Sequence, residues 1–266
     1  MFFLGIDIGS LSCDAVIIDE EKNILSSSVI PTGAKNIESI AQAKKNVLDA
    51  AGIMEKDIRF IISTGYGRTR VKERDGAVTE ITCHAKGIKH MIPETRILID
   101  IGGQDSKALC LDAKGNVVDF AMNDKCAAGT GRFLEAMARA LEVDINQLGD
   151  LDKDATSDLV LSSMCTVFAE SEVVSLIADG TEQKEIAKGL NRAIAARTTS
   201  LVKRVAKNIE GLTVSMSGGV ARNKGVVKAI AESMKLERIN TPESPDIVGA
   251  LGAAIIAFEK WKAQKS

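Results

Sequence analysis

Two short segments of the chain place an aspartate directly before a glycine turn. They are Ile6–Ser10, with the sequence IDIGS, and Ile99–Gly103, with the sequence IDIGG. A glycine turn lets backbone N–H groups approach phosphate oxygens because no side chain intervenes. An aspartate at the end of a strand can hold hydrated Mg²⁺, which proteins bind through few carboxylates together with substrate phosphates. The pattern predicts a Mg-nucleotide site with Asp7 and Asp100 in the Mg²⁺ shell.

The surroundings of the two turns repeat as well. An apolar run, an aspartate and a polar turn follow each copy. A shift of 93 residues aligns three landmarks between the copies: Asp7 with Asp100, Asp19 with Asp112 and Asn23 with Asn116. One copy alone is more often an ordinary hairpin. A constant shift suggests a duplicated β-hairpin unit, and so two similar lobes whose turns face each other across a nucleotide cleft.

A third glycine turn, Gly218-Gly219, follows the apolar segment Thr213–Ser217 and precedes a predicted helix. A strand, a glycine pair and a helix start commonly bring backbone against a ribose or a phosphate. The chain has neither a Walker loop nor the Gly-x-Gly-x-x-Gly fingerprint of dinucleotide-binding proteins. Beside the two aspartates, the predicted nucleotide-binding residues are Gly9, Ser10, Leu11, Ser12, Cys13, Gly102, Gly103, Lys107, Gly218, Gly219 and Asn223.

The composition restricts the classes of function. The chain has 266 residues, a formal net charge of −2 and 3% aromatic residues. A near-neutral charge gives no support for binding to nucleic acid or to an anionic membrane, and few aromatic residues argue against base-stacking surfaces. Apolar stretches stay well short of the roughly 18 residues of a membrane span. The start, Met1–Leu4, lacks a basic region, so we expect a first strand rather than a signal peptide.

Strands and helices alternate along the chain, which predicts an α/β protein. We expect lobe I to comprise residues 1–96 and 246–266, and lobe II residues 97–245. The apolar segments predict strands near 58–63 and 213–217, in addition to the two hairpins. The predicted helices lie near residues 37–51, 80–88, 131–141, 166–178, 185–208, 223–235 and 246–262.

Two of the five cysteines, Cys126 and Cys165, each lie shortly before a predicted helix. Helix N-termini lower the pKa of a thiol and suit anionic thiolate clusters, although a free cysteine is more often a small buried hydrophobe. Without a Cys-x-x-Cys pair, one chain cannot easily supply four thiolates, whereas a twofold dimer could. An odd number of widely spaced cysteines argues for a reducing cytosol and against a disulfide framework.

Several longer motifs together resemble one protein family over essentially the whole chain. That family is the ATP-dependent activators (component A) of 2-hydroxyacyl-CoA dehydratases, related to the ATPase subunits of benzoyl-CoA reductase. It belongs to the actin, sugar-kinase and heat-shock-chaperone ATPase superfamily. The resemblance therefore implies a duplicated α/β ATPase fold. The motifs that carry it are Thr64–Arg68, Cys83–Ala85, Asp100–Asp105, Asn123–Phe133 and Cys165–Glu172.

The resemblance implies a homodimer with one [4Fe–4S] cluster bridged between the subunits, and Cys126 and Cys165 of each chain match its ligands. It also implies ATP and ADP as ligands and ferredoxin or flavodoxin as the electron donor. The electron would pass at low potential to an iron–sulfur partner. That partner is a dehydratase, a benzoyl-CoA reductase or a reductase with a double-cubane cluster. Such proteins work in anaerobic cytoplasm.

Further roles are predicted within this frame. Gln104 is expected beside the γ-phosphate, where it orients water or senses the nucleotide state, and Glu170 is the less certain candidate for a base. Cys83 and His84 look like half of a metal site, but no second pair stands at zinc-ligand spacing, so both are predicted to be structural. The first phosphate loop of the family commonly ends with Lys, whereas this chain has Asp14. Either another cation, with Lys107 as the candidate, supplies the missing positive charge, or the nucleotide binds in a different position.

Two other classes of protein fit part of the pattern. A small-molecule kinase of the same superfamily would need an aspartate base beside a substrate pocket, and it has no need of the cysteine motifs. A nucleotide-switched binding protein without redox activity would need only the glycine turns. A brown cluster band in the anaerobically purified protein separates the activator from both.

Overall fold

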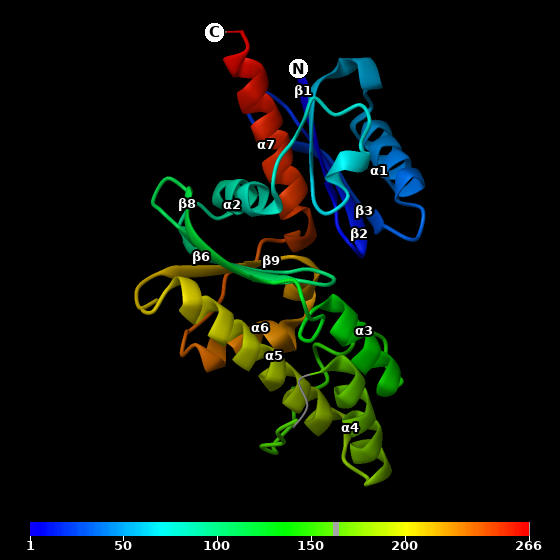
Figure 1. Ribbon diagram of the computed structural model, residues 1–266, viewed down its shortest axis with the longest axis vertical. Coiled ribbons are helices and arrows are strands. Elements are labelled where there is room, and N and C mark those ends of the chain that lie inside the picture. The colour runs from blue at the N-terminus through cyan, green and yellow to red at the C-terminus, as the bar shows by residue number, and fades with distance from the viewer. Residues whose placement is uncertain (162–164, 266) are drawn as a thin grey trace. The chain divides into compact units, whose positions relative to one another are not determined.

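The computed structural model describes residues 1–161 and 165–265 (Figure 1). The chain divides into two compact units. Unit 1 comprises Met1–Arg96, Leu111–Val118 and Pro242–Ser266, and unit 2 comprises Ile97–Cys110 and Asp119–Thr241. Strands and helices alternate along the chain, as the sequence predicted. Among the helices of the described residues, none combines the length and the apolar character that crossing a membrane requires.

Unit 1 is built on a five-stranded sheet with the strand order β3-β2-β1-β4-β5. β1 and β2 form an antiparallel hairpin, and β4 runs parallel to β1. The strands are β1 (Phe2–Ile8), β2 (Ser12–Ile18), β3 (Ile24–Pro31), β4 (Ile58–Thr64) and β5 (Gly76–Ala77).

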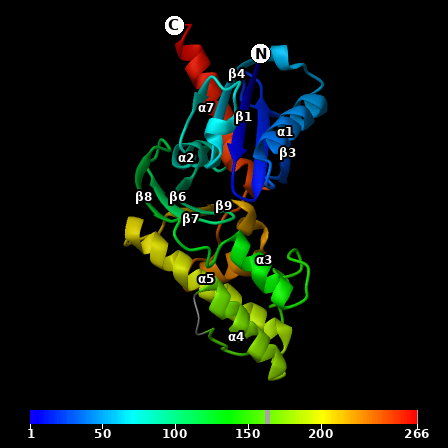
Figure 2. The same cartoon turned by 45° about the vertical axis from the view of Figure 1, so that its right-hand side comes forward.

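Helices cover both faces of this sheet. Successive side chains of a strand point to opposite faces, so apolar residues of one strand can pack against helices on both sides. Phe3 packs with helix α7 in one apolar cluster, whereas Leu4 and Ile6 pack with helix α1 in another. Figure 2 shows α7 and α1 on either side of β1. The helices of this unit are α1 (Asn36–Ala51), α2 (Glu80–Met91) and α7 (Val248–Ala263), with short 3-10 turns η1 (Glu55–Asp57), η2 (Arg68–Arg70) and η4 (Pro245–Ile247).

The start of α7 packs unusually close to its neighbours through small residues. A Cβ on Gly5 of β1 would overlap the carbonyl oxygen of Ala250, and a Cβ on Gly252 would overlap that of Cys83 in α2. The run from Gly249 to Ala254 therefore allows backbone-to-backbone contact of α7 with both β1 and α2. Close packing of this kind depends on missing side-chain atoms, so it is sensitive to a single methyl group.

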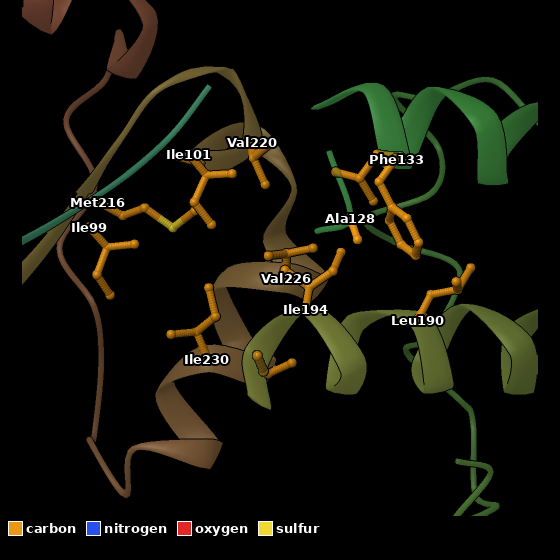
Figure 3. Packing of buried hydrophobic residues seen from close by; sticks show 14 of the residues in the cluster. Ile99, Ile101, Ala128, Phe133, Leu190, Ile194, Met216, Val220, Val226 and Ile230 are labelled. Atoms are coloured by element: carbon orange, nitrogen blue, oxygen red, sulfur yellow. The ribbon is translucent and has the colours of Figure 1, made fainter. Parts of the chain in front are cut away.

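Unit 2 has a four-stranded sheet with the order β8-β7-β6-β9. Its apolar core lies between the sheet and the helices, and Figure 3 shows Leu190 and Ile194 of α5 directed toward Phe133 of α3 and Val226 of α6. The strands are β6 (Thr95–Ile101), β7 (Ser106–Leu111), β8 (Val117–Asn123) and β9 (Thr213–Ser217). The helices are α3 (Gly131–Ala140), α4 (Thr166–Ala178), α5 (Gln183–Val205) and α6 (Lys224–Ser233), with the 3-10 turn η3 (Gly219–Arg222).

The predicted duplication of the hairpin is confirmed. A shift of 93 residues carries the bounds of β1 onto those of β6. The polar turns also share one geometry. The side-chain nitrogen Nδ2 of Asn23 donates to Asp19 Oδ2 at 2.9 Å, and Nδ2 of Asn116 donates to Asp112 Oδ2 at 2.8 Å. The repeated sequence thus specifies a repeated hairpin down to its side-chain hydrogen bonds.

The predicted helices are confirmed, with small differences at their ends. Two helices begin later than expected because a 3-10 turn precedes each of them: η3 before α6, and η4, with Pro245 at its first position, before α7. Proline fixes φ and lacks a backbone N–H, so it suits the first turn of such an element. α5 ends at Val205 rather than near residue 208, since Ala206 adopts an extended conformation.

The close packing of α7 predicts a large effect of one methyl group. We expect Gly252→Ala to lower the free energy of unfolding by about 1–3 kcal/mol, because the clash with the Cys83 carbonyl outweighs the better helix propensity of alanine. Gly189→Ala in α5 is the matched control, since its Cβ would lie an ordinary 3.4 Å from Leu159. Urea unfolding of the two variants measures the difference, and equal stability would contradict this account of α7.

Candidate functional site

The turn of the first hairpin is held by backbone hydrogen bonds. The Gly9 N–H donates to the Ser12 carbonyl at 2.9 Å, and the Thr32 N–H donates to the Leu11 carbonyl at 2.9 Å. Thr32 Oγ1 also donates to the Gly9 carbonyl at 2.9 Å. The predicted ligand contacts Gly9, Ser10, Leu11 and Ser12 therefore lie together in one ordered, half-buried turn.

Cys13, also predicted to contact the nucleotide, points elsewhere. It is the second residue of β2, and its side chain is fully buried in the apolar cluster beside α1. Burial, and then the nearby carboxylates of Asp14 and Asp7, raise the pKa of the Cys13 thiol to about 12. The side chain of Cys13 is thus a neutral part of the core and is not available to a ligand.

The Asp7 carboxylate is enclosed by backbone on two sides. A Cβ on Gly65 would lie 2.5 Å from Asp7 Oδ1, and a Cβ on Gly249 would overlap Oδ2. Gly65 also has a φ of +87°, a conformation that other residues adopt rarely. Because Gly249 stands at the start of α7, the carboxylate faces the positive end of that helix.

His84 lies against the same carboxylate, with its Nε2 3.4 Å from Asp7 Oδ2. The sequence predicted a structural role for both Cys83 and His84, and their environments differ. Cys83 is fully buried, and burial raises the pKa of its thiol to about 12. His84 instead belongs to the surroundings of the predicted Mg²⁺ ligand. Its place in the Cys83–Ala85 motif was the one signal that could have indicated this.

Asp14 faces Asp7 directly across the hairpin, since the two residues are paired in the register of β1 and β2. Its side chain is only 5% exposed. Ser12 Oγ donates to Asp14 Oδ2 at 2.9 Å, whereas Oδ1 has no hydrogen-bond partner among the described residues. Burial and the charge of Asp7 raise the pKa of the Asp14 carboxyl group well above its usual value. The first hairpin therefore carries two buried carboxyl groups side by side.

The second hairpin balances its charges internally. Lys107 Nζ lies 3.3 Å from Asp100 Oδ2 and 2.6 Å from Asp105 Oδ2. All three side chains are buried, and a buried charge is tolerated when it is paired in this way. The Ser217 hydroxyl donates to Asp100 Oδ1 at 2.8 Å. Asp105 and Ser217 were missed by the sequence analysis.

The third glycine turn adjoins Asp100. Gly218 has a φ of +83°, and a Cβ on it would lie 3.0 Å from Asp100 Oδ1. Gly219, the next residue, is exposed at the start of η3. Asn223 caps α6 by accepting from the Val226 N–H at 2.9 Å. The structure thus brings Gly218 to Asp100, while the side-chain oxygen of Asn223 serves the helix.

The turn of the second hairpin is attached to the beginning of α3. The N–H groups of Gly131 and Arg132 donate to the carbonyls of Gly102 and Gly103, both at 2.9 Å. The fully buried Thr130 hydroxyl lies 2.9 Å from the Gly103 carbonyl and 2.6 Å from that of Ala127. Gln104, in the same turn, is exposed. The predicted phosphate turn is therefore joined by hydrogen bonds to the segment that carries Cys126.

The two cysteines of the predicted cluster have open environments. Cys165 is exposed and forms the N-cap of α4, and Cys126 is half-buried before α3. Residues 162–164, directly before Cys165, lie outside the described residues. Glu170 is exposed on α4. Within the described residues, no three His, Cys, Asp or Glu side chains are grouped to hold a metal ion. Two thiolates from one chain would need further ligands.

Comparison with known proteins identifies the family. The model of the BadF/BadG/BcrA/BcrD ATPase family matches residues 4–257. The chain belongs to this family. It is an ATPase, and the resemblance inferred from its motifs is confirmed.

Individual relatives cover almost the whole of this ATPase. An activator of lactoyl-CoA dehydratase from Anaerotignum propionicum is 45% identical over 97% of this chain and 98% of its own length. The (R)-2-hydroxyglutaryl-CoA dehydratase activating ATPase of Acidaminococcus fermentans is 40% identical over 98% of each chain. The structure of the Clostridium difficile activator of 2-hydroxyisocaproyl-CoA dehydratase with bound ADPNP is 42% identical. It has a TM-score of 0.92 and matches 100% of this chain and 97% of that one.

Solved structures of sugar kinases are similar to this ATPase at 12–17% identity with TM-scores of 0.54–0.58. At that identity they share the fold alone. The predicted duplicated actin and sugar-kinase type of ATPase fold is confirmed by these structures together with the activators.

The enclosure of Asp7 predicts a specific effect on nucleotide binding. We expect Gly65→Ala to weaken binding of Mg-ADP at least tenfold, because the new methyl group displaces the Asp7 carboxylate. Gly33→Ala is the matched control, since Gly33 also has a positive φ, of +60°, but has open space around its Cβ position. Gly33→Ala likewise places a side chain at a positive φ, which L-residues adopt rarely. Calorimetric titration with Mg-ADP measures the affinities, and an equal loss in both variants would contradict the role of Asp7.

Proposed function

We propose that this ATPase is a homodimeric iron–sulfur protein that couples ATP binding and hydrolysis to one-electron transfer at low potential into a partner enzyme. The observation that carries the proposal is the hydrogen-bonded connection from the Gly102-Gly103 turn through Thr130 to Ala127, next to Cys126. It gives a nucleotide at the turn a direct means of acting on a cysteine. The relatives named as activators of acyl-CoA dehydratases support the same conclusion.

The nucleotide is bound by the glycine turns. Asp7 and Asp100 hold the Mg²⁺ shell, and the backbone of residues 9–12, Gly102 and Gly103 contacts phosphate oxygens. Gln104 is exposed at the turn, which is the position expected of a side chain that orients the attacking water. Glu170, exposed on α4, is the second candidate for a base. Lys107 is buried between Asp100 and Asp105. Its positive charge therefore attracts the phosphates electrostatically from a distance and does not contact them.

One [4Fe–4S] cluster is shared by the two subunits, each of which supplies Cys126 and Cys165. The residues fit such a group, because both sulfur-bearing side chains reach solvent, whereas Cys13 and Cys83 are buried thiols. Symmetry then completes four thiolate ligands from two per chain. When bound, the cluster supplies a one-electron redox centre.

The surface beside Cys165 supports the homodimer. Three large apolar side chains of α4, Val167, Phe168 and Val174, are 67%, 66% and 55% exposed. Exposed apolar side chains gathered on one helix mark a surface that another protein covers. We propose that a second copy of the chain covers this surface, because a [4Fe–4S] cluster held by two cysteines of one chain needs two more thiolate ligands.

The partners follow from the same chemistry. Ferredoxin or flavodoxin donates the electron, and the acceptor is an iron–sulfur dehydratase, a benzoyl-CoA reductase or a reductase with a double-cubane cluster. A solvent-accessible cluster is oxygen-sensitive, so we propose that the protein works in anaerobic cytoplasm. The kinase and non-redox alternatives share the fold but give Cys126 and Cys165 no role, and an anaerobic preparation without cluster absorbance would favour them.

The cysteine assignment predicts a stoichiometry. The anaerobically purified dimer should contain about four irons, and Cys126→Ala or Cys165→Ala should lose the iron and the colour, because symmetry removes two ligands at once. Both variants should still bind ATP, since the glycine turns are unchanged. Cys110→Ala, at the half-buried cysteine of β7, should keep the cluster. Retention of iron in either of the first two variants overturns the ligand assignment.

The connection through Thr130 predicts a loss of communication. In the wild type, nucleotide binding should slow amide hydrogen exchange both at residues 102–105 and at residues 126–134. Thr130→Val removes the hydroxyl that is shared between the Gly103 and Ala127 carbonyls, so it should keep the first effect and weaken the second. Thr199→Val is the matched control, because Thr199 Oγ1 lies 2.9 Å from Ser233 Oγ elsewhere in unit 2. An unchanged response in Thr130→Val would exclude this route.

A further inference from the structure

We infer that Asp14, together with Asp7, forms a divalent-cation site in the first hairpin, and that the ion takes the place which Lys107 occupies in the second. The inference rests on the proposed function of the hairpins as phosphate-binding turns. It adds to that function a ligand, Asp14, and a requirement that nucleotide binding depends on a divalent ion bound by this pair.

The duplication places Asp14 and Lys107 at one position. Asp7 pairs with Asp14 in the register of β1 and β2, and Asp100 pairs with Lys107 in the register of β6 and β7. In each hairpin, the aspartate that the duplication repeats therefore lies opposite a second charged residue. In the second hairpin that residue is a cation, which contacts two carboxylates. In the first hairpin it is another carboxyl group.

The groups around Asp14 leave one oxygen unused. Burial, then Asp7 on β1 and Asp246 in η4, raise the pKa of Asp14, whereas the hydrogen bond from Ser12 and the charge of His84 on α2 lower it. Ser12 Oγ occupies Oδ2, and Oδ1 is buried without a hydrogen-bond partner in the part of the chain that the structure describes. A buried carboxyl group without a counter-charge favours its neutral form, and it becomes an anion only when a cation lies beside it. An ion bound between Asp7 and Asp14 supplies that counter-charge.

The chemistry of the pair fits a hard divalent cation such as Mg²⁺. Such an ion is bound by one or two carboxylates and completes its octahedron with water and substrate phosphates. As no larger group of acidic, His or Cys ligands occurs among residues 1–161 and 165–265, the protein alone cannot enclose the ion. The bare protein should therefore hold the metal weakly, and the complex with nucleotide should hold it tightly.

The experiment compares three substitutions in one hairpin. Asp14→Asn keeps the size of the side chain and its contact with Ser12 but removes the charge. Asp14→Lys recreates the arrangement of the second hairpin. Asp19→Asn is the matched control, because it removes a carboxylate from the same hairpin, at a residue hydrogen-bonded only within its turn. Circular dichroism and urea unfolding verify that each variant is folded.

Two measurements decide the outcome. Electron paramagnetic resonance of free Mn²⁺ measures metal binding, with Mn²⁺ alone and with Mn²⁺ plus ADP. Fluorescence of a labelled ADP measures nucleotide binding in EDTA and in Mg²⁺. We expect wild-type protein and Asp19→Asn to bind ADP at least 30-fold more tightly with Mg²⁺. Asp14→Asn should bind Mn²⁺ in the ADP complex at least tenfold more weakly. Asp14→Lys should bind ADP with less than a threefold difference between EDTA and Mg²⁺.

The results separate the two proposals. If wild-type protein binds ADP, and the metal dependence is the same in Asp14→Asn, Asp14→Lys and wild type, the cation site is excluded while the phosphate-binding function stands. If wild-type protein binds no ADP in either buffer, the proposed function itself fails. Should Asp14→Lys not fold, the Mn²⁺ affinity of Asp14→Asn alone decides the question.

Discussion

The hydrogen bonds between the Gly102-Gly103 turn and the beginning of α3 are the constraint on which the rest of the account depends. The turn offers its carbonyls to the N–H groups of Gly131 and Arg132, and the Gly102 N–H donates to the Asp105 carbonyl, so the turn is fixed to the beginning of the helix. Thr130 extends the connection to Ala127 beside Cys126. The one proton of this buried hydroxyl is shared between the Gly103 and Ala127 carbonyls, each of which also accepts a backbone N–H, so the turn and the Ala127 segment are held together by several bonds. Under the proposed function, a nucleotide at the turn and a cluster at Cys126 would therefore act on the same few residues.

The duplicated hairpins perform the same task with different electrostatics. In the second copy, Lys107 neutralises Asp100 and Asp105 within the protein itself. In the first, Asp14 takes the position of the lysine, and its buried Oδ1 has no hydrogen-bond partner within the described part of the chain. The two copies share the bounds of β1 and β6 at a shift of 93 residues and the Asp–Asn turn, whereas one charged position reversed its sign. Under the proposed cation site, the second hairpin balances its charges internally, whereas the first depends on an ion.

Much of the fold could be predicted from the sequence because its signals are local or periodic. The shift of 93 residues located the second hairpin, and apolar periodicity located the helices. The contacts at Asp7 and Asp100 could not be predicted, since His84 and Ser217 reach them only through the packing of α2 and β9. The burial of the Cys13 side chain has a different reason. A residue next to a phosphate turn can still point into the core, because side chains alternate along a strand.

Access of an iron chelator to the cluster tests the central claim most directly. The rate of iron removal by a water-soluble chelator is measured in the anaerobic protein without nucleotide, with ADP and with a non-hydrolysable ATP analogue. If the nucleotide turn acts on the Cys126 segment through α3, the ATP analogue should expose the cluster and accelerate chelation several-fold relative to ADP. Equal rates in all three states would contradict the account, because the turn and the cluster would then be independent.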